Sequence, residues 1–163
     1  MYNLGDQFKL DHSKAISDPK NIIQGSKYRI TILTERLIRF EYSETGTFLD
    51  KPTELVWFRN TPPVSFKVNQ TSRTLEIVTK YVRISYIKNK PFIGSKISPS
   101  SNLKVELLNT NRIWYYKHPE VRNFGGPGIT LQNNKGDMQF SKSLYSLDGF
   151  ASIDDSNHKV IDE

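Results

Sequence analysis

Apolar and polar residues alternate with a period of two along much of this chain. Tyr28, Ile30 and Ile32 fall on one side of such a run, and Arg29 and Thr31 fall on the other. An extended strand points successive side chains to opposite faces, so this alternation predicts a half-buried β-strand.

The next polar segment, residues 34–36, is typical of a turn. A second alternating run covers residues 38–42, and the two runs together predict a β-hairpin. Four more β-rich runs follow, at residues 65–68, 74–79, 81–86 and 103–108. Breaks rich in turn-forming residues lie before, between and after these runs, at residues 61–63, 69–73, 91–101 and 125–128. The sequence shows no pattern of a long helix, so the predicted fold class is all-β, an antiparallel β-sandwich.

The length of 163 residues fits a single domain. Residues 1–25 alternate more weakly and are interpreted as an N-terminal edge segment of that domain, with an edge strand followed by a loop. Residues 26–163 are interpreted as the β-sandwich itself. Residues 159–163 resemble the beginning of another strand, so we expect the chain to end before the last strands of the sandwich.

Composition narrows the classes of function. A net charge of +6 and a pI near 9.4 suit nucleic-acid binding, but the cations stand singly along the predicted strands rather than in runs. They are expected to form a solvated face instead: Arg29, Arg39, Lys67, Arg73, Arg83 and Lys104. This scatter predicts no nucleic-acid partner. No membrane partner is predicted either, because the sequence contains no signal peptide and no apolar span. The absence of cysteine favours the cytoplasm and leaves no disulfide or thiolate chemistry.

Two segments near the C-terminus carry the strongest functional signal. Residues 144–156 have the sequence Leu-Tyr-Ser-Leu-Asp-Gly-Phe-Ala-Ser-Ile-Asp-Asp-Ser, and residues 123–126 are Asn-Phe-Gly-Gly. Together they resemble the end of the N-terminal domain of glycoside hydrolase family 31 enzymes, the α-glucosidases and their relatives. Residues 26–60 and Trp114 extend the similarity, which runs from about residue 26 to residue 156.

The resemblance implies a galactose-mutarotase-like β-sandwich that precedes a catalytic (β/α) barrel. In that family the barrel carries an Asp nucleophile and an Asp general acid/base and hydrolyses α-glycosidic bonds of oligosaccharides with retention. The chain is therefore expected to lack catalytic residues, to need no cofactor, to brace the barrel of the same polypeptide and to shape the rim of its pocket. The alternative is a stand-alone carbohydrate-binding or scaffolding module. Its aromatic platform would draw on Trp57, Phe58, Trp114, Tyr115 and Tyr116.

The resemblance also points to a loop that would reach the α-linked oligosaccharide. Ser146, Leu147 and Asp148 are expected to lean over the barrel mouth, with Asp148 the side chain best suited to meet a sugar hydroxyl. Leu147 stands where relatives commonly carry Arg, which offers five hydrogen-bond donors. This part of the rim is therefore expected to be more apolar than in relatives.

A glycine-rich turn precedes this loop. Asn123, Gly125 and Gly126 match the family's motif. These two glycines and Gly128 are expected to adopt positive φ rather than to cradle a phosphate, since neither a helix start nor a Lys follows them. Polar residues of the family's motif are replaced at three later positions, Pro127, Ile129 and Gln132.

The acidic motif after the loop is interpreted as structural. In an extended segment Asp154 and Asp155 point to opposite faces, which makes them unsuitable as a pair of catalytic carboxylates. An Asx or Ser turn through Ser156 is expected to close the strand. No metal site is predicted, because each of the three histidines stands alone without a second ligand at a suitable spacing.

Overall fold

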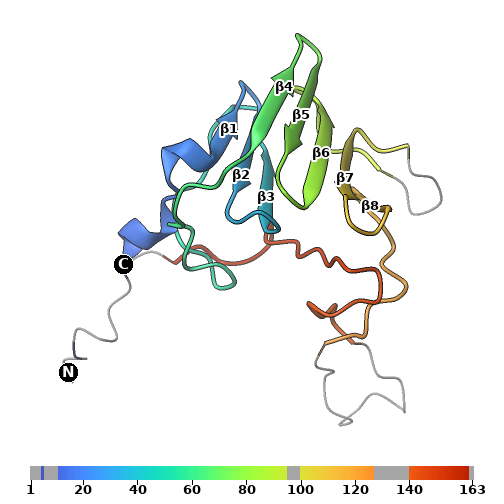
Figure 1. Cartoon of the computed structure of the whole chain (residues 1–163). Helices are drawn as coiled ribbons and strands as arrows, with labels where there is room; N and C mark the ends of the chain where they lie inside the picture. The colour runs from blue at the N-terminus through green and yellow to red at the C-terminus, as the bar shows by residue number, and fades with distance from the viewer. Residues whose placement is uncertain (1–4, 6–10, 95–99, 127–139, 162–163) are drawn as a thin grey trace.

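The computed structural model of the chain describes residues 5, 11–94, 100–126 and 140–161. Two short 3-10 helices, η2 (His12–Ala15) and η3 (Pro19–Asn21), precede the first strand. A three-stranded antiparallel sheet follows, in the order β1 (Ile22–Gln24), β2 (Tyr28–Ile32) and β3 (Ile38–Tyr42). A five-stranded antiparallel sheet runs in the order β4 (Lys67–Gln70), β5 (Thr74–Val78), β6 (Val82–Ile87), β7 (Leu103–Leu107) and β8 (Arg112–Tyr115). The two sheets are the layers of a sandwich (Figure 1), and the prediction of an all-β antiparallel sandwich is confirmed.

The predicted hairpin is formed by β2 and β3. Tyr28 lies opposite Tyr42 and Ile32 lies opposite Ile38, so the apolar residues of both strands share one face. The four later runs are also strands, and each of their ends lies within two residues of the predicted one. The largest shift is in β4, which continues to Gln70 and shortens the break expected after it.

The core lies between the two sheets. Its buried side chains come from the inner faces of both sheets: Tyr28, Ile30, Ile32, Leu75, Ile77, Val82, Ile84, Tyr86, Leu103 and Val105. The rings of Tyr28 and Tyr86 meet edge to face across the core, with their centroids 5.2 Å apart. Removal of these apolar side chains from water is the main force that holds the sheets together.

The outer face of the three-stranded sheet differs from the prediction. β2 is buried on both faces, with Arg29 5% and Thr31 2% exposed, so it is not the half-buried strand that the alternation indicates. The loop that contains Asp50 and the C-terminal segment that contains Asp155 form ion pairs with arginines of this face. Alternation identifies the apolar side of a strand but carries no information on which loops cover the polar side.

The predicted solvated face is consequently only partly present. Arg29 and Arg39 are paired with carboxylates in the covered layer rather than solvated. The other four cations are exposed or half-buried: Lys67, Arg73, Arg83 and Lys104.

The alternation in the sequence does not predict two of the strands, β1 and β8. β1 has only three residues, and it pairs with β2 as the edge strand of its sheet, after the two 3-10 helices rather than before a loop. β8 has four residues and follows a turn in which Asn111 takes φ 53°. Its Trp114 lies opposite Val105 and stacks on the ring of Phe40 at a centroid distance of 5.9 Å. β1 is too short for a two-residue period to identify it, and β8 shows no alternation between buried and exposed positions.

Candidate functional site

Residues 121–126 and 140–147 pair with each other away from the two sheets, and we call these two segments the arm (Figure 1). Asn123 lies opposite Ser146 in an antiparallel bridge. Backbone hydrogen bonds of 3.1 Å on both sides of this bridge extend the pairing. The two motifs that resemble the hydrolase family therefore meet in the fold, although about twenty residues separate them in the sequence.

Asn123 is the main polar link within the arm. Its side-chain oxygen accepts hydrogen bonds from the backbone N–H groups of Gly125 at 3.0 Å and Ser143 at 2.9 Å. Its side-chain nitrogen donates to the carbonyl oxygen of Ser143 at 2.9 Å. An amide side chain both donates and accepts, so Asn123 satisfies backbone groups on both segments of the arm.

The two glycines of the arm differ in what they require. Gly125 has a φ of +78°, as predicted. Gly126 does not adopt positive φ, so the prediction is wrong for this residue. A Cβ atom at Gly126 would lie 2.5 Å from the hydroxyl oxygen of Ser141, so glycine is needed here for close approach of the two segments. Four predicted features of the following segment lie outside the described residues: Pro127, Gly128, Ile129 and Gln132.

Asp148 is tied to two arginines. Its side chain is 8% exposed, and its Oδ1 accepts from Nη1 of Arg112 at 2.6 Å and from Nη1 of Arg122 at 3.4 Å. Arg112 begins β8, and Arg122 lies in the arm. These charge-assisted bonds fasten the predicted substrate loop to the five-stranded sheet. Within the described part of the chain, no donor reaches Oδ2 of Asp148.

Ser146 and Leu147 complete the predicted loop. The hydroxyl oxygen of Ser146 accepts from the backbone N–H of Asp148 at 3.0 Å and so shapes the turn. The side chain of Leu147 is 57% exposed. Gly149 closes the turn with a φ of +77°. The three predicted residues therefore lie together, but only Leu147 presents most of its side chain to solvent, and contact with a substrate stays a prediction for all three.

Glu120 is a buried anchor at the base of the arm. It takes a φ of 51°, and its side chain is fully buried. The carboxylate accepts hydrogen bonds from the hydroxyl and the backbone N–H of Ser152, and it lies 3.5 Å from Nζ of Lys142. The three residues join the end of β8, the arm and the chain after it. They are far apart in the sequence, so no sequence signal identifies this anchor.

His118 supports the same anchor. Its Nδ1 accepts from the backbone N–H of Glu120 at 3.0 Å, and its ring meets the edges of Tyr115 and Phe150. Burial lowers the pKa of His118, against the opposing charges of Asp148 and Glu120. The neutral form is therefore favoured, which keeps Nδ1 available as an acceptor.

Residues 152–161, which we call the strap, return from the arm to the three-stranded sheet (Figure 1). Asp155 accepts from the hydroxyl of Thr53 at 3.0 Å and from Nη1 of Arg39 at 3.5 Å. An antiparallel bridge between Thr53 and Val160 holds the end of the strap. The strap thus links the arm to the layer that covers β2 and β3.

The two carboxylates of the strap serve different partners. Oδ1 of Asp154 accepts from the backbone N–H of Ser156 at 3.0 Å, so the predicted Asx turn is present at this residue. Hydrogen bonds from Ser156 lower the pKa of Asp154. Asp154 is exposed, whereas Asp155 is half-buried against Arg39. These contacts support a structural role for both residues.

The layer beneath the strap contains a cluster of charged side chains. Glu41 accepts from Nε and Nη2 of Arg29 at 2.7 and 2.9 Å and from Nη2 of Arg39 at 3.1 Å. Burial would raise the pKa of Glu41, but hydrogen bonds from Arg29 and the charge of Arg39 outweigh it, and the pKa lies below its ordinary value. Arg59 is 2% exposed and donates to the carbonyl oxygen of Leu49 at 3.3 Å.

Large apolar side chains are exposed along the arm. Six of them are more than half exposed: Val121, Phe124, Phe140, Leu144, Tyr145 and Leu147. They do not belong to the core between the sheets. A concentration of apolar surface on a projecting, hydrogen-bonded element is typical of an interaction surface.

The aromatic residues proposed as a sugar platform are divided between the core and the surface. Trp114 stacks on Phe40, and Tyr116 packs against the core. Trp57 and Phe58 are 47% and 61% exposed. The five aromatic residues therefore do not form one shared platform.

Across residues 5, 11–94, 100–126 and 140–161, no group of three or more His, Cys, Asp or Glu residues is placed to hold a metal ion. In these ranges no helix has the length and apolar character to cross a membrane.

A scan against protein-family models finds no matching family, and a comparison with curated proteins finds no match.

Proposed function

We propose that this chain is the non-catalytic N-terminal β-sandwich of an α-glucosidase similar to glycoside hydrolase family 31. The parent enzyme hydrolyses α-glycosidic bonds in oligosaccharides with retention, through carboxylates that belong to its barrel. The sandwich braces that barrel and shapes the rim of the substrate pocket. The cysteine-free sequence favours a cytoplasmic parent.

The arm is the observation that carries the proposal. It unites the two motifs that resemble the family, and it exposes six large apolar side chains. Burial of one such side chain stabilises a protein by about 1.5–3 kcal/mol, so a partner surface that covers several of them gains substantially. Anchors at Asp148 and Glu120 hold the arm to β8 in one orientation, which suits a fixed contact with a neighbouring domain.

The loop at the base of the arm supplies the rim. Leu147 offers an exposed apolar surface to a sugar in the pocket. Oδ1 of Asp148 accepts hydrogen bonds from Arg112 and Arg122, and Oδ2 is the acceptor for a hydroxyl group of the sugar. In this arrangement the arginines orient the carboxylate, and the hydroxyl of the substrate completes its hydrogen bonds.

The stand-alone carbohydrate-binding module has weaker support. A free-standing module needs an exposed aromatic platform, and Trp114 and Tyr116 are engaged in packing. Tyr115 packs against His118, so Trp57 and Phe58 remain of the five proposed residues, and Nζ of Lys14 already lies 5.7 Å from the ring centre of Phe58.

Matched substitutions in the isolated chain and in the full-length polypeptide test the proposal. Leu144→Asp and Tyr145→Asp alter exposed arm residues, and Leu37→Asp alters another apolar residue that is more than half exposed, in the turn between β2 and β3. In the isolated chain all three variants should melt like the wild type. In the full-length polypeptide the arm variants should each lose on the order of 1–3 kcal/mol of stability together with α-glucosidase activity, and Leu37→Asp should not. Full-length arm variants with wild-type melting and activity would refute the docking role.

A further inference from the structure

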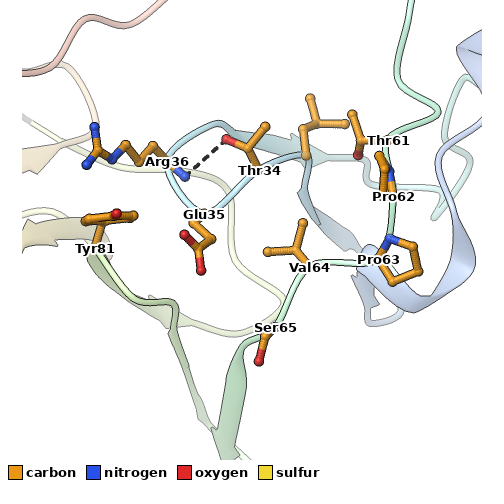
Figure 2. Close-up of a pocket in the computed structure, with 10 residues that line it drawn as sticks. Thr34, Glu35, Arg36, Thr61, Pro62, Pro63, Val64, Ser65 and Tyr81 are labelled. Atoms are coloured by element: carbon orange, nitrogen blue, oxygen red, sulfur yellow. Dashed lines mark hydrogen bonds between the residues drawn. The ribbon is translucent and has the colours of Figure 1, made fainter.

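A hollow of about 690 Å³ opens at the surface of the sandwich (Figure 2). Residues 33–36 of the turn between β2 and β3 form one wall, and Tyr81 lies beside them. Residues 61–65, which lead into β4, form the opposite wall. The volume lies in the range of small-molecule sites. The two C-terminal segments that resemble the hydrolase family, residues 123–126 and 144–156, do not line it.

Hydrogen bonds fix the wall formed by the turn between β2 and β3 and the turn between β5 and β6. The hydroxyl of Thr79, which is 5% exposed, donates to the carbonyl oxygen of Glu35 at 2.8 Å. The hydroxyl oxygen of Thr79 also accepts from the backbone N–H of Val82 at 3.1 Å. Thr34 closes its own turn by accepting from the backbone N–H of Leu37 at 2.9 Å. The turns before β3 and β6 are therefore locked to each other.

A fully buried amide fixes the opposite wall. Oδ1 of Asn21 accepts from the backbone N–H of Val64 at 2.7 Å, and its Nδ2 donates to the carbonyl oxygen of Pro62 at 3.0 Å. Asn21 ends η3, so the N-terminal segment holds residues 61–65 in place. Both walls exist without a ligand, which lowers the entropic cost of binding one.

The hollow combines opposite charges with an apolar side. Figure 2 shows the carboxylate of Glu35 between Tyr81 and Val64, and no described residue forms a hydrogen bond or ion pair with it. The guanidinium carbon of Arg36 lies 3.8 Å from the ring centre of Tyr81. Pro62, Pro63 and Val64 supply apolar surface across from Tyr81, and Ser65 adds a hydroxyl.

These groups discriminate between ligand classes. The carboxylate of Glu35 repels a phosphate or carboxylate ligand. Arg36 and Lys80, whose Nζ lies 5.1 Å from the Tyr81 ring centre, repel a cationic ligand. A neutral polyhydroxyl compound avoids both repulsions. Its hydroxyls donate to Glu35 and accept from Arg36, while its C–H groups contact the proline wall.

We propose that this hollow binds one neutral sugar unit of an oligosaccharide. The inference goes beyond the role of the arm and does not depend on the parent enzyme, because it concerns binding by this chain alone. The open shape leaves much of the sugar in water, so the dissociation constant should be on the order of 1 mM.

Titration of the ¹⁵N-labelled chain with maltotriose and with cellotriose, followed by amide chemical shifts, tests the proposal. At least one trisaccharide should shift the amides of residues 34–36, 65 and 81. Glu35→Ala should weaken binding about tenfold, the loss expected for a hydrogen bond to a charged group. The variant should melt like the wild type, since no described residue pairs with the carboxylate. Glu54→Ala, at an exposed glutamate that does not line the hollow, should leave binding unchanged.

Several outcomes would overturn the inference. One is the absence of amide chemical-shift changes with either trisaccharide at about 20 mM, a concentration well above the expected dissociation constant. Another is that the chemical-shift changes are confined to Trp57 and Phe58. Stronger binding of inorganic phosphate than of both sugars, or equal affinity in Glu35→Ala, would also refute it. A full-length polypeptide without glucosidase activity would refute the proposed function but leave this binding site unaffected.

Discussion

Substitution of Glu41 by Gln should destabilise the sandwich through the charged layer under the strap. Glu41 is 13% exposed at its side chain and holds Arg29, which is 6% exposed, through two hydrogen bonds of 2.7 and 2.9 Å. Gln keeps the size of the side chain but removes its charge. The variant therefore leaves two poorly solvated guanidinium groups, those of Arg29 and Arg39, with less compensating charge.

The expected loss of unfolding free energy depends on the ion pairs that Arg29 and Arg39 keep after the substitution. Loss of one partner of a buried ion pair costs about 3–5 kcal/mol. Asp50 still pairs with Arg29 at 2.7 Å, and Asp155 still lies 3.5 Å from Arg39. We therefore expect a lower cost, about 2–3 kcal/mol of unfolding free energy. For a chain of this length the melting temperature should fall by about 4–12 °C.

Urea denaturation and calorimetry measure both quantities, and the same hairpin provides the control. Glu44 pairs with Lys27 at 2.7 Å, but both side chains are exposed, so Glu44→Gln should produce no measurable change.

The pKa of Glu41 is lowered in the folded state. Its stabilising contribution is thus complete above the ordinary Glu pKa of about 4.3 and is lost as the pH falls through the lower folded-state value. The difference between wild type and Glu41→Gln should shrink below that pH. Equal stability of Glu41→Gln and Glu44→Gln at neutral pH would refute the reasoning.

Three other substitutions test separate parts of the structure. Asn123→Ala should accelerate amide hydrogen exchange at residues 125 and 143 while β2 and β6 stay protected, because it removes acceptors from the arm alone; equal loss of protection in the sheets would contradict this. Ile84→Ala removes a fully buried core side chain and should cost about 2–5 kcal/mol in urea denaturation, so a loss below about 1 kcal/mol would contradict the placement of the core. Asp148→Asn in the full-length polypeptide should lower kcat/KM by the equivalent of about 1–3 kcal/mol if Oδ2 meets a substrate hydroxyl. Normal kcat/KM with a lowered melting temperature would assign Asp148 a purely structural role.

The two-residue pattern predicted the fold where a strand has one apolar face. β5 and β6 alternate between buried and half-buried or exposed positions, so their inner faces were identified correctly. The same pattern failed for Arg29, because the polar face of β2 is covered by Asp50 from a distant loop. A charge that is buried by a tertiary contact has the same sequence signature as a solvated one.

The candidate site was only partly predictable for a similar reason. Family resemblance indicated Asn123 and Asp148, and the structure shows that both residues connect segments that lie far apart in the sequence. It did not indicate that Arg112 and Arg122 occupy one oxygen of Asp148, since neither belongs to a motif. Glu120 also carried no signal, because its partner Ser152 is 32 positions away.

The stereochemistry of hydrolysis tests the central claim most directly. The full-length polypeptide is mixed with an α-linked disaccharide such as maltose, and the first anomer of the released glucose is followed by ¹H NMR before mutarotation. We expect the α-anomer from the full-length polypeptide and no hydrolysis by this 163-residue chain alone. Formation of the β-anomer, failure of the full-length polypeptide to hydrolyse any α-glucoside, or turnover by the isolated chain would contradict the proposed function.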